Sequence, residues 1–521
     1  MRETTIDILI LGGGINGAGI ARDLGLRRQQ AGISLQVALV EQKQFASGTS
    51  GKNSQLIHGG LRYLKQLKVG LVKEALRERS ILRNLAPHMV EPLPILIPIY
   101  SRLEKLKYFM GLRLYDQLAG EHSIAKHREV SRGEMAQLEP SMAQKGLICG
   151  ALYYDCTVHS ARFVLENLYD AAANGILLAN YTRGRLVQRQ EDGSWLVRLE
   201  DVATGDSFET QAKKVIDATG AWSESPEHQP RLVRGSHLVL PRLTAEEHAV
   251  AYFDDNGRIV FFLPWGSHKH LTLLGTTDVD HKEGPDDVRI KKDEVEYLAG
   301  IAQKLYPSAP SFSPIAAFSS LRPLIPDSTQ DPAAASREHK IWNTKDNVLR
   351  ILGGKYTTYR AMSEEAVDLV LKEMAPWFSS QKRTAGEPLA GNTEKALSRL
   401  KAEIPNLSDR HYLARTEMES LVREYGVHTR ELLTMLPAED FGPVTRIQYA
   451  RMAYAVQHEM ALRLADVFFV STYLGYESKW DAAQLEPYSR LMGSWLGWDQ
   501  AREAREIMNT LQSTALPPGS F

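Results

Sequence analysis

The sequence predicts an α/β fold in three parts, and three patterns along the chain carry this prediction. Residues 6–11 form a short apolar run that ends in glycines and is followed by a helix pattern, which is typical of a parallel sheet whose strands are buried on both faces. Between 238 and 274, short β-rich runs separated by polar turns indicate a second, more antiparallel region. Beyond Glu387 the apolar residues follow the helical period, so we expect an all-helical C-terminal region.

Length and composition limit the kind of protein this is. The chain has 521 residues, and cores stop growing at about 250 to 300 residues, so two or three domains are expected. Hydrophobic residues make up 43% and charged residues 24%, with a formal net charge of -1. A chain with this balance has no bulk attraction for polyanions, so we expect no nucleic-acid partner.

Cysteines and the N-terminus point to the cytoplasm. Cys149 and Cys156 are too few for a disulfide framework and lack the further ligands of a zinc site, so no metal is expected. The N-terminus runs directly into a strand pattern and leaves no room for a signal peptide. No apolar run reaches the roughly 18 residues of a membrane span.

The N-terminal pattern predicts a dinucleotide site. A strand at Ile6 to Leu11, a helix from Ile15 to about Gln30 and a second strand at Leu35 to Val40 make a βαβ unit. Between strand and helix, Gly12, Gly14 and Gly17 match G-x-G-x-x-G, in which the glycines allow a tight turn, a close pyrophosphate and close helix packing. Glu41 ends the second strand, where an acid binds a ribose and repels a 2′-phosphate, so FAD or NAD fits and NADP does not.

Other parts of the chain add to this unit. The stretch 49–63 is rich in Ser, Gly and Asn and suits a second phosphate contact. Strand patterns at Lys214 to Asp217 and Val348 to Leu352 precede glycines and predict that the first sheet is discontinuous in sequence. After the second of these, Thr357 or Thr358 is expected to cap a helix that runs toward Glu364, and the positive end of that helix could stabilise a negatively charged flavin edge.

Several blocks resemble the FAD-dependent glycerol-3-phosphate dehydrogenase family. They are Gly-Gly-Gly-Ile-Asn-Gly-Ala-Gly-Ile-Ala-Arg-Asp at 12–23, Leu-Ile-His-Gly-Gly-Leu-Arg-Tyr-Leu at 56–64, and blocks in the same order at 217–222, 234–239, 275–279, 321–324 and 353–360. The resemblance covers about 6–370 and, more loosely, 458–461 and 496–499. It implies a Rossmann-like FAD-binding domain of the glutathione-reductase or amino-acid-oxidase type at 1–90, 145–225 and 315–385, an antiparallel substrate domain at 91–144 and 226–314, and a helical domain at 386–521.

Two positions depart from the family pattern. Gln55 stands where the family usually has Lys, and Val470-Ser471-Thr472 stands where Arg-Arg-Thr is common. The first change is expected to remove a cation near the flavin and the second to remove basic charge from the C-terminal domain.

The resemblance also implies the site. The expected catalytic residues are His237 as the first candidate base, Lys355 as the alternative base and Arg322 beside the developing alkoxide. The substrate phosphate is expected at Arg62, Tyr63, Arg322, Arg337 and Lys355. Non-covalent FAD is expected at Gly12, Gly14, Ile15, Asn16, Gly17, Glu41, Thr49, Ser50, Asn53, Ser54, Leu56, His58, Gly59, Thr219, Gly220, Trp222, Gly354, Lys355, Tyr356 and Thr357.

The resemblance implies oxidation of sn-glycerol 3-phosphate to dihydroxyacetone phosphate, with electrons passed to a quinone. An oxygen-using glycerol-3-phosphate oxidase, or a related FAD-dependent oxidoreductase of 2-hydroxy acids or amines, remains an alternative. A homodimer at the inner face of the cell membrane is also implied. The segment Pro92 to Gly120 mixes apolar residues with Arg102, Lys105, Lys107 and Arg113, which suits the headgroup region of an anionic bilayer, or equally an ordinary buried helix pair with snorkelling lysines.

Overall fold

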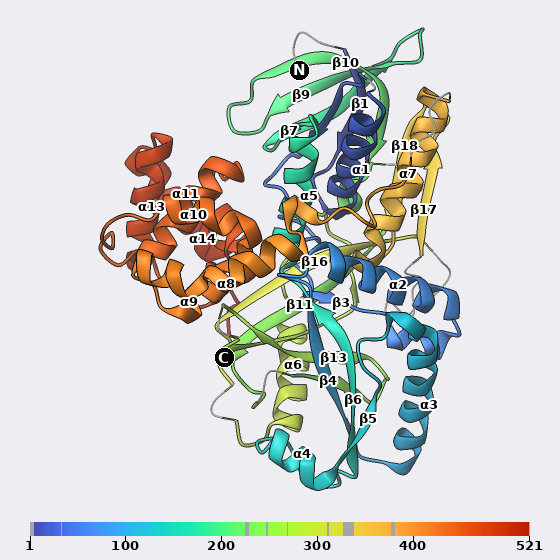
Figure 1. Ribbon diagram of the computed structural model, residues 1–521, viewed down its shortest axis with the longest axis vertical. Coiled ribbons are helices and arrows are strands. Elements are labelled where there is room, and N and C mark those ends of the chain that lie inside the picture. Colours follow the sequence, from blue (N-terminus) through green and yellow to red (C-terminus); the bar gives the residue numbers. More distant parts are fainter. Residues whose placement is uncertain are drawn as a thin grey trace.

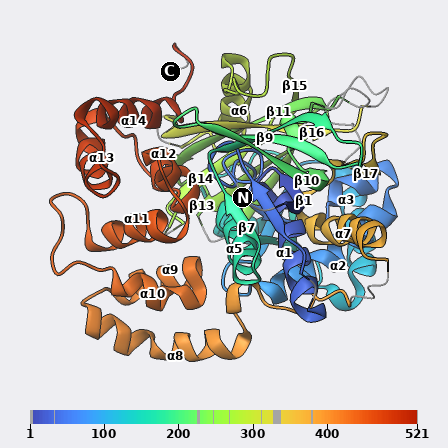
Figure 2. The same ribbon diagram turned by 90° about the horizontal axis from the view of Figure 1, so that it is seen from above.

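The computed structural model describes residues 5–32, 34–224, 229–245, 248–267, 269–309, 312–326, 338–376 and 381–519. Within these residues there are two large sheets, the first above the second in the view of Figure 1. A group of helices from the C-terminal part of the chain lies to one side of both sheets (Figures 1 and 2). The predicted combination of a parallel sheet, a more antiparallel sheet and a helical region is confirmed.

The first sheet has eight strands among the described residues, with the order β17-β18-β10-β1-β2-β7 and the pair β8 and β9 attached beside β10. Its parallel strands are β1 (Ile6–Leu11), β2 (Val37–Val40), β7 (Leu177–Ala179), β10 (Ser207–Asp217) and β18 (Val348–Gly353). The antiparallel additions are β8 (Thr182–Arg189), β9 (Trp195–Asp201) and β17 (His339–Asn343). Because β10 pairs with both β1 and β18, segments more than a hundred residues apart complete the sheet as predicted.

Three helices pack together beside the first sheet: α1 (Ile15–Ala31), α5 (Ser160–Ala173) and α7 (Tyr359–Met374). Residues 6–11 are almost fully buried because helices and strands cover them, as their continuous apolar pattern requires. The carboxyl ends of the parallel strands face the second sheet, and this edge therefore holds the ligand site of such a sheet.

The second sheet has ten strands among the described residues and is antiparallel except for the pair β4 and β12. Its members are β3 (Leu56–Ile57), β4 (Glu91–Ile99), β5 (Arg128–Ser131), β6 (Cys149–Thr157), β11 (Arg231–Pro241), β12 (Ala249–Phe253), β13 (Ile259–Trp265), β14 (Leu271–Gly275), β15 (Val279–Asp280) and β16 (Ala316–Leu324). The helices α2 (Val69–Leu85), α3 (Arg102–Ala119), α4 (Arg132–Leu138) and α6 (Lys292–Leu305) surround it (Figure 1). Strands β6 and β16 belong to this sheet, although the predicted domain division places 145–225 and 315–385 with the nucleotide-binding part.

The C-terminal region is helical, as predicted. It contains α8 (Glu394–His411), α9 (Arg415–Tyr425), α10 (Thr429–Thr434), α11 (Arg446–His458), α12 (Leu464–Asp466), α13 (Ala482–Leu496) and α14 (Gln500–Gln512). The departure at Val470 and Ser471 lies in a buried π-helical turn, Val467–Ser471. There the guanidinium of Arg162, from α5, donates a hydrogen bond to the carbonyl of Ser471 over 3.2 Å and pairs with Glu459, so a buried cation reaches this turn from another part of the chain.

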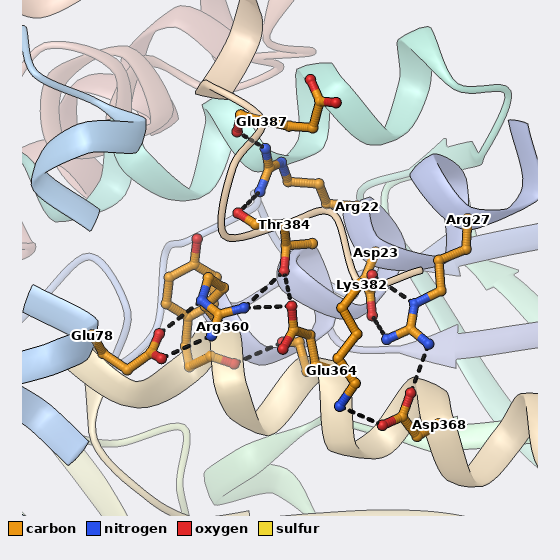
Figure 3. Close-up of polar contacts among 12 residues, drawn as sticks. Arg22, Asp23, Arg27, Glu78, Arg360, Glu364, Asp368, Lys382, Thr384 and Glu387 are labelled. Atoms are coloured by element: carbon orange, nitrogen blue, oxygen red, sulfur yellow. Dashed lines mark hydrogen bonds and ion pairs between the residues drawn. The ribbon is translucent and has the colours of Figure 1, made fainter. Parts of the chain in front are cut away.

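A buried polar network joins the segment before this region to helices α1 and α7, and α7 to α2 (Figure 3). Arg22 of α1 donates to the carbonyl oxygen of Glu387 over 2.6 Å, and Arg360 of α7 pairs with Glu78 of α2. Between them, the hydroxyl of Thr384 donates to Glu364 over 2.6 Å. Breaking one partner of a buried ion pair typically costs about 3 to 5 kcal/mol, so this network fixes how the chain leaves α7.

The segment Pro92 to Gly120 divides into two parts of different kind. Its first half is β4, a strand inside the second sheet whose Leu93, Ile95, Leu96, Ile97 and Ile99 are buried. These side chains do not face a bilayer, and for them the membrane prediction is wrong, because a run of this composition also suits a central strand. Its second half is α3, which keeps an exposed apolar face. Among the described residues, no helix has both the length and the apolar character needed to cross a bilayer.

Candidate active site

The glycine turn between β1 and α1 forms a cradle for a pyrophosphate. Gly12 has a φ of 106°, and a Cβ there would lie 2.6 Å from the carbonyl oxygen of Ala218. A Cβ at Gly17 would lie 1.9 Å from the carbonyl oxygen of Gly12, so only glycine lets α1 pack this closely on the turn. Gly14 is the N-cap of α1, whose positive end therefore faces the cavity.

Two side chains from the neighbouring segments hold this turn. The carboxylate of Glu41 accepts hydrogen bonds from the backbone N–H of Gly13 over 2.7 Å and of Lys43 over 2.9 Å. The hydroxyl of Ser50 accepts one from the N–H of Ile15 over 2.9 Å. Burial raises the pKa of Glu41 above its ordinary value, and its backbone hydrogen bonds oppose this shift. The acid at the end of β2 thus lies beside the glycine cradle, where a ribose would bind.

One cavity of about 1060 Å³ runs from this cradle to the second sheet. Seventeen of the residues predicted for the cofactor line it: Gly12, Gly14, Ile15, Asn16, Glu41, Thr49, Ser50, Asn53, Ser54, Leu56, His58, Thr219, Gly220, Trp222, Gly354, Lys355 and Tyr356. Ligand pockets typically measure roughly 300 to 1,000 Å³, so this cavity is at the large end of that range and has room for a large ligand.

Three predicted cofactor residues do not line the cavity but support the loops that do. Gly17 packs α1 against the turn, as described above. The N–H of Gly59 donates to Tyr115 and Asp155 over 3.0 and 3.1 Å. The hydroxyl of Thr357 accepts a hydrogen bond from the N–H of His58 over 3.1 Å. These residues shape the lining loops without lining the cavity themselves.

Cationic side chains line the end of the cavity that is opposite the glycine cradle. Arg62 and Arg322 both line it, and both pair with Asp278, at 3.7 and 3.1 Å. Arg322 also donates to the carbonyl oxygen of Thr277 over 3.2 Å and to the hydroxyl of Thr276 over 3.0 Å. Two guanidinium groups held side by side on one cavity wall are suited to a phosphate or carboxylate, because each presents a planar fork of N–H donors. Arg337, also predicted here, lies outside the described residues.

Lys355 completes the cationic wall. Its Nζ is buried, has no hydrogen-bond partner among the described residues, and lies 3.9 Å from the centre of the Tyr63 ring. Burial lowers the pKa of Lys355 to about 8, helped by the nearby positive charge of Arg62 and opposed by Tyr63. A buried ammonium with no acceptor is costly, so this Nζ indicates a wall built for a ligand that supplies one.

Two histidines line the same cavity. His237 lies on β11 and is only 1% exposed, and its Nε2 shares a hydrogen bond of 2.9 Å with the hydroxyl of Ser54. Burial, together with the charge of Arg322, lowers the pKa of His237 to about 3. Burial likewise lowers the pKa of His58 to about 4. Both imidazoles are therefore neutral at physiological pH.

Sequence reasoning did not single out the acids that support this wall. Asp278 belongs to a recognised block at 275–279, but nothing in that block shows that it faces two arginines from distant segments. Asp155 lines the cavity and accepts from Arg79 over 2.7 Å and from Tyr115 over 2.7 Å. No local pattern around Asp155 could have identified it, since its partners come from α2 and α3.

Two details differ from the expectations. Gln55 does not line the cavity: its carbonyl oxygen Oε1 accepts from the N–H of Ser160 over 2.8 Å and from the hydroxyl of Tyr473 over 3.0 Å. With a φ of 56°, its backbone is left-handed, and its side chain joins α5 and the C-terminal region instead of the flavin. Thr358 is the N-cap of α7, but its side chain makes no capping hydrogen bond, because its hydroxyl donates to the carbonyl oxygen of Lys355.

Comparisons with known proteins agree with this geometry. A family model described as FAD dependent oxidoreductase matches residues 7–356, and one described as the C-terminal domain of alpha-glycerophosphate oxidase matches residues 382–503. The aerobic glycerol-3-phosphate dehydrogenase of Escherichia coli K12 is 32% identical, over 90% of this chain and 94% of the relative. The alpha-glycerophosphate oxidase of Streptococcus pyogenes serotype M3 is 28% identical, over 97% of this chain and 94% of the relative.

A similar structure is also known. The structure of the glycerol-3-phosphate dehydrogenase from Bacillus halodurans complexed with FAD superposes with a TM-score of 0.79, covering 98% of this chain and 95% of that one at 24% identity. This likeness extends over the two sheets and the helical region together.

Proposed function

Since the chain belongs to the FAD-dependent glycerol-3-phosphate dehydrogenase family, we propose that it oxidises sn-glycerol 3-phosphate to dihydroxyacetone phosphate. The observation that carries the proposal is the single cavity, which has a dinucleotide cradle at one end and three cationic side chains at the other. A phosphorylated substrate that is oxidised needs a redox cofactor at one end of the cavity and cations for its phosphate at the other.

The residues present fit FAD. The glycine cradle at Gly12 and Gly14 leaves room where a Cβ would meet the wall, and the N-terminus of α1 favours an anion there. Glu41, at the end of β2, suits a ribose hydroxyl pair. When bound, FAD supplies the acceptor for the hydride that leaves C2 of the substrate. We expect it to be non-covalent, because no histidine or cysteine motif typical of covalent attachment is evident in the sequence.

The phosphate of the substrate is assigned to the cationic wall. Arg62 and Arg322 present N–H donors to the cavity, and Asp278 holds them at fixed positions from behind. The nitrogen of Lys355 has no acceptor among the described residues, and we leave it to the C2 hydroxyl instead of the phosphate. We assign Arg322 a second task, the stabilisation of charge that develops on the C2 oxygen, since an oriented guanidinium is worth most in a cavity from which water is excluded.

The proton of the C2 hydroxyl needs an acceptor with a pKa near the working pH. Lys355, with a pKa of about 8, meets this condition better than His237, with a pKa of about 3. We therefore assign the proton to Lys355. His237 is placed as a neutral hydrogen-bonding group, aligned by Ser54, that orients the substrate.

Initial rates with a set of substrates and acceptors test this function. We expect turnover with glycerol 3-phosphate and a soluble quinone, and rates at least about 10²-fold lower with glycerol, lactate or glycine, because these leave the cationic wall without a phosphate. Equal turnover of a 2-hydroxy acid or an amino acid would assign the chain to the alternative chemistry. Faster reoxidation by oxygen than by quinone would make it an oxidase.

We also propose that α3 binds the surface of an anionic membrane, where the protein passes electrons to a quinone. Four exposed side chains lie on one face of this helix at helical spacing: Leu103, Leu106, Met110 and Leu114. Exposed cations flank them, at Arg102, Lys107 and Arg113. An apolar stripe with basic borders suits the headgroup region of an anionic bilayer, where a quinone is also dissolved.

Flotation with anionic liposomes tests this surface. The variant Met110→Asp should lose most of its binding, whereas Met508→Asp should keep it, because Met508 is similarly exposed but lies on α14. Equal binding by both variants would remove α3 from the interface. The position at the inner face of the cell membrane and the homodimer both stay predictions, and light scattering can check the second.

A further inference from the structure

The amine of Lys355 has surroundings that are unusual for a lysine. Its Nζ is buried, no hydrogen-bond acceptor among the described residues contacts it, and the face of the Tyr63 ring lies 3.9 Å away. Gly60 makes room for it, since a Cβ at that position would lie 3.2 Å from Nζ. Lys355 is also among the residues that line the cavity.

Burial changes the chemistry of this amine. Its pKa of about 8 leaves a large fraction neutral at slightly alkaline pH, whereas an ordinary lysine, with a pKa near 10.4, is almost entirely protonated there. A neutral amine is a nucleophile toward a carbonyl carbon, as in enzymes that form imines with their substrates. The cationic wall therefore contains a nucleophile, the amine of Lys355.

The two arginines decide which carbonyl compounds would reach this amine. Arg62 and Arg322 line the same cavity and pair with Asp278, so the phosphate group of the proposed function would be held in a fixed place. A phosphate held there brings a carbonyl two or three bonds away toward Lys355, and holding two reactants together speeds their reaction strongly. A carbonyl compound without a phosphate lacks this advantage.

We propose that Lys355 is a site of reversible imine formation with small phosphorylated aldehydes, which would block the cavity covalently. The amine nitrogen bonds to the aldehyde carbon, the carbonyl oxygen leaves as water with both amine protons, and no oxidant or reductant is consumed. The inference rests on the phosphate site of the proposed function, but it extends that site to a ligand class that is not oxidised there.

A second lysine with a lowered pKa, Lys52, provides a control. Burial also lowers the pKa of Lys52 to about 8, yet Lys52 does not line the cavity. If a lowered pKa alone were sufficient, both lysines would react. If the phosphate site directs the reaction, only Lys355 should react.

The experiment uses the FAD-loaded protein with glyceraldehyde 3-phosphate, cyanoborohydride to reduce the imine to a stable amine, and mass spectrometry of peptides. We expect one adduct per chain at Lys355, at least about 10-fold faster than with unphosphorylated glyceraldehyde, suppressed by inorganic phosphate and increasing as the pH passes through about 8. Lys355→Arg should lose the adduct, and Lys52→Arg should keep it.

Three results would overturn the inference: equal labelling of Lys52, equal rates with and without the phosphate, or an adduct that forms only after FAD is removed. If glycerol 3-phosphate reduces the flavin but no adduct forms at Lys355, the imine site is wrong and the proposed function stands. If glycerol 3-phosphate does not reduce the flavin either, the phosphate site itself is wrong.

Discussion

Asp278 is the residue whose substitution tests the cationic wall most specifically. Its carboxylate is 6% exposed and pairs with Arg62 and Arg322, whose side chains are about a quarter exposed. Arg322 keeps two other acceptors, Thr276 and Thr277, if the carboxylate is removed. No other acidic side chain is found within ion-pair distance of Arg62 among the described residues, so Arg62 is the residue that we expect to move.

The expected change in KM follows from the loss of the contact between Arg62 and Asp278. The contact between Arg62 and Asp278 is an ion pair at 3.7 Å with a partly exposed arginine, and such pairs contribute about 0.2 to 1 kcal/mol. About 1.4 kcal/mol corresponds to a factor of ten, so we expect KM for glycerol 3-phosphate to rise by up to about 5-fold, with kcat little changed. Steady-state kinetics with a dye acceptor measures both values, and binding of inorganic phosphate to the oxidised protein measures the site without turnover.

A lower KM in Asp278→Asn would contradict this expectation. If Asp278 only reduced the positive charge of the wall, Asp278→Asn would bind phosphate more tightly and lower KM. Asp280→Asn is the matched control, since Asp280 pairs with Arg231 over 2.8 Å and does not line the cavity, and it should leave both constants unchanged.

The remaining predictions concern three other parts of the site. Arg322→Ala should slow anaerobic flavin reduction by about 10²-fold or more, as the loss of an oxyanion donor usually does, and stopped-flow absorbance measures this rate. The rate of flavin reduction should rise with pH up to about 8 and then level off, because Lys355 is protonated below its pKa and cannot accept a proton. Lys355→Met should remove this pH dependence. An unchanged pH profile in that variant would assign the base to His237. Gly17→Ala should be purified with little or no flavin, because its Cβ would lie 1.9 Å from the carbonyl oxygen of Gly12, whereas Gly70→Ala, whose Cβ meets nothing within 4 Å, should keep a full complement by absorbance.

The parts of the structure that local sequence determines could be predicted well. The strand at 6–11, the glycine turn and Glu41 are close in sequence, and the physical need of each glycine could be stated before the packing was known. The return of β10 and β18 to the first sheet was also predictable, because both end in the same strand-then-glycine pattern.

What could not be predicted depends on register and on backbone direction. Asp278 meets Arg322 because β11 pairs with both β15 and β16, a pairing that no local pattern reveals. Gln55 precedes a cavity residue, yet its left-handed backbone and its hydrogen bonds take its side chain away from the cavity. The apolar run at 92–99 has a composition that fits a bilayer or a sheet equally, and its strand partners decided the outcome.

The proposed function requires that one cavity of this chain holds both FAD and glycerol 3-phosphate in a reactive arrangement. Anaerobic titration of the purified yellow protein with glycerol 3-phosphate measures this. We expect one equivalent of substrate per bound flavin to bleach the flavin absorbance and to yield one equivalent of dihydroxyacetone phosphate. A protein that carries a full complement of FAD but stays yellow with excess glycerol 3-phosphate, while dithionite bleaches it, would not have this function.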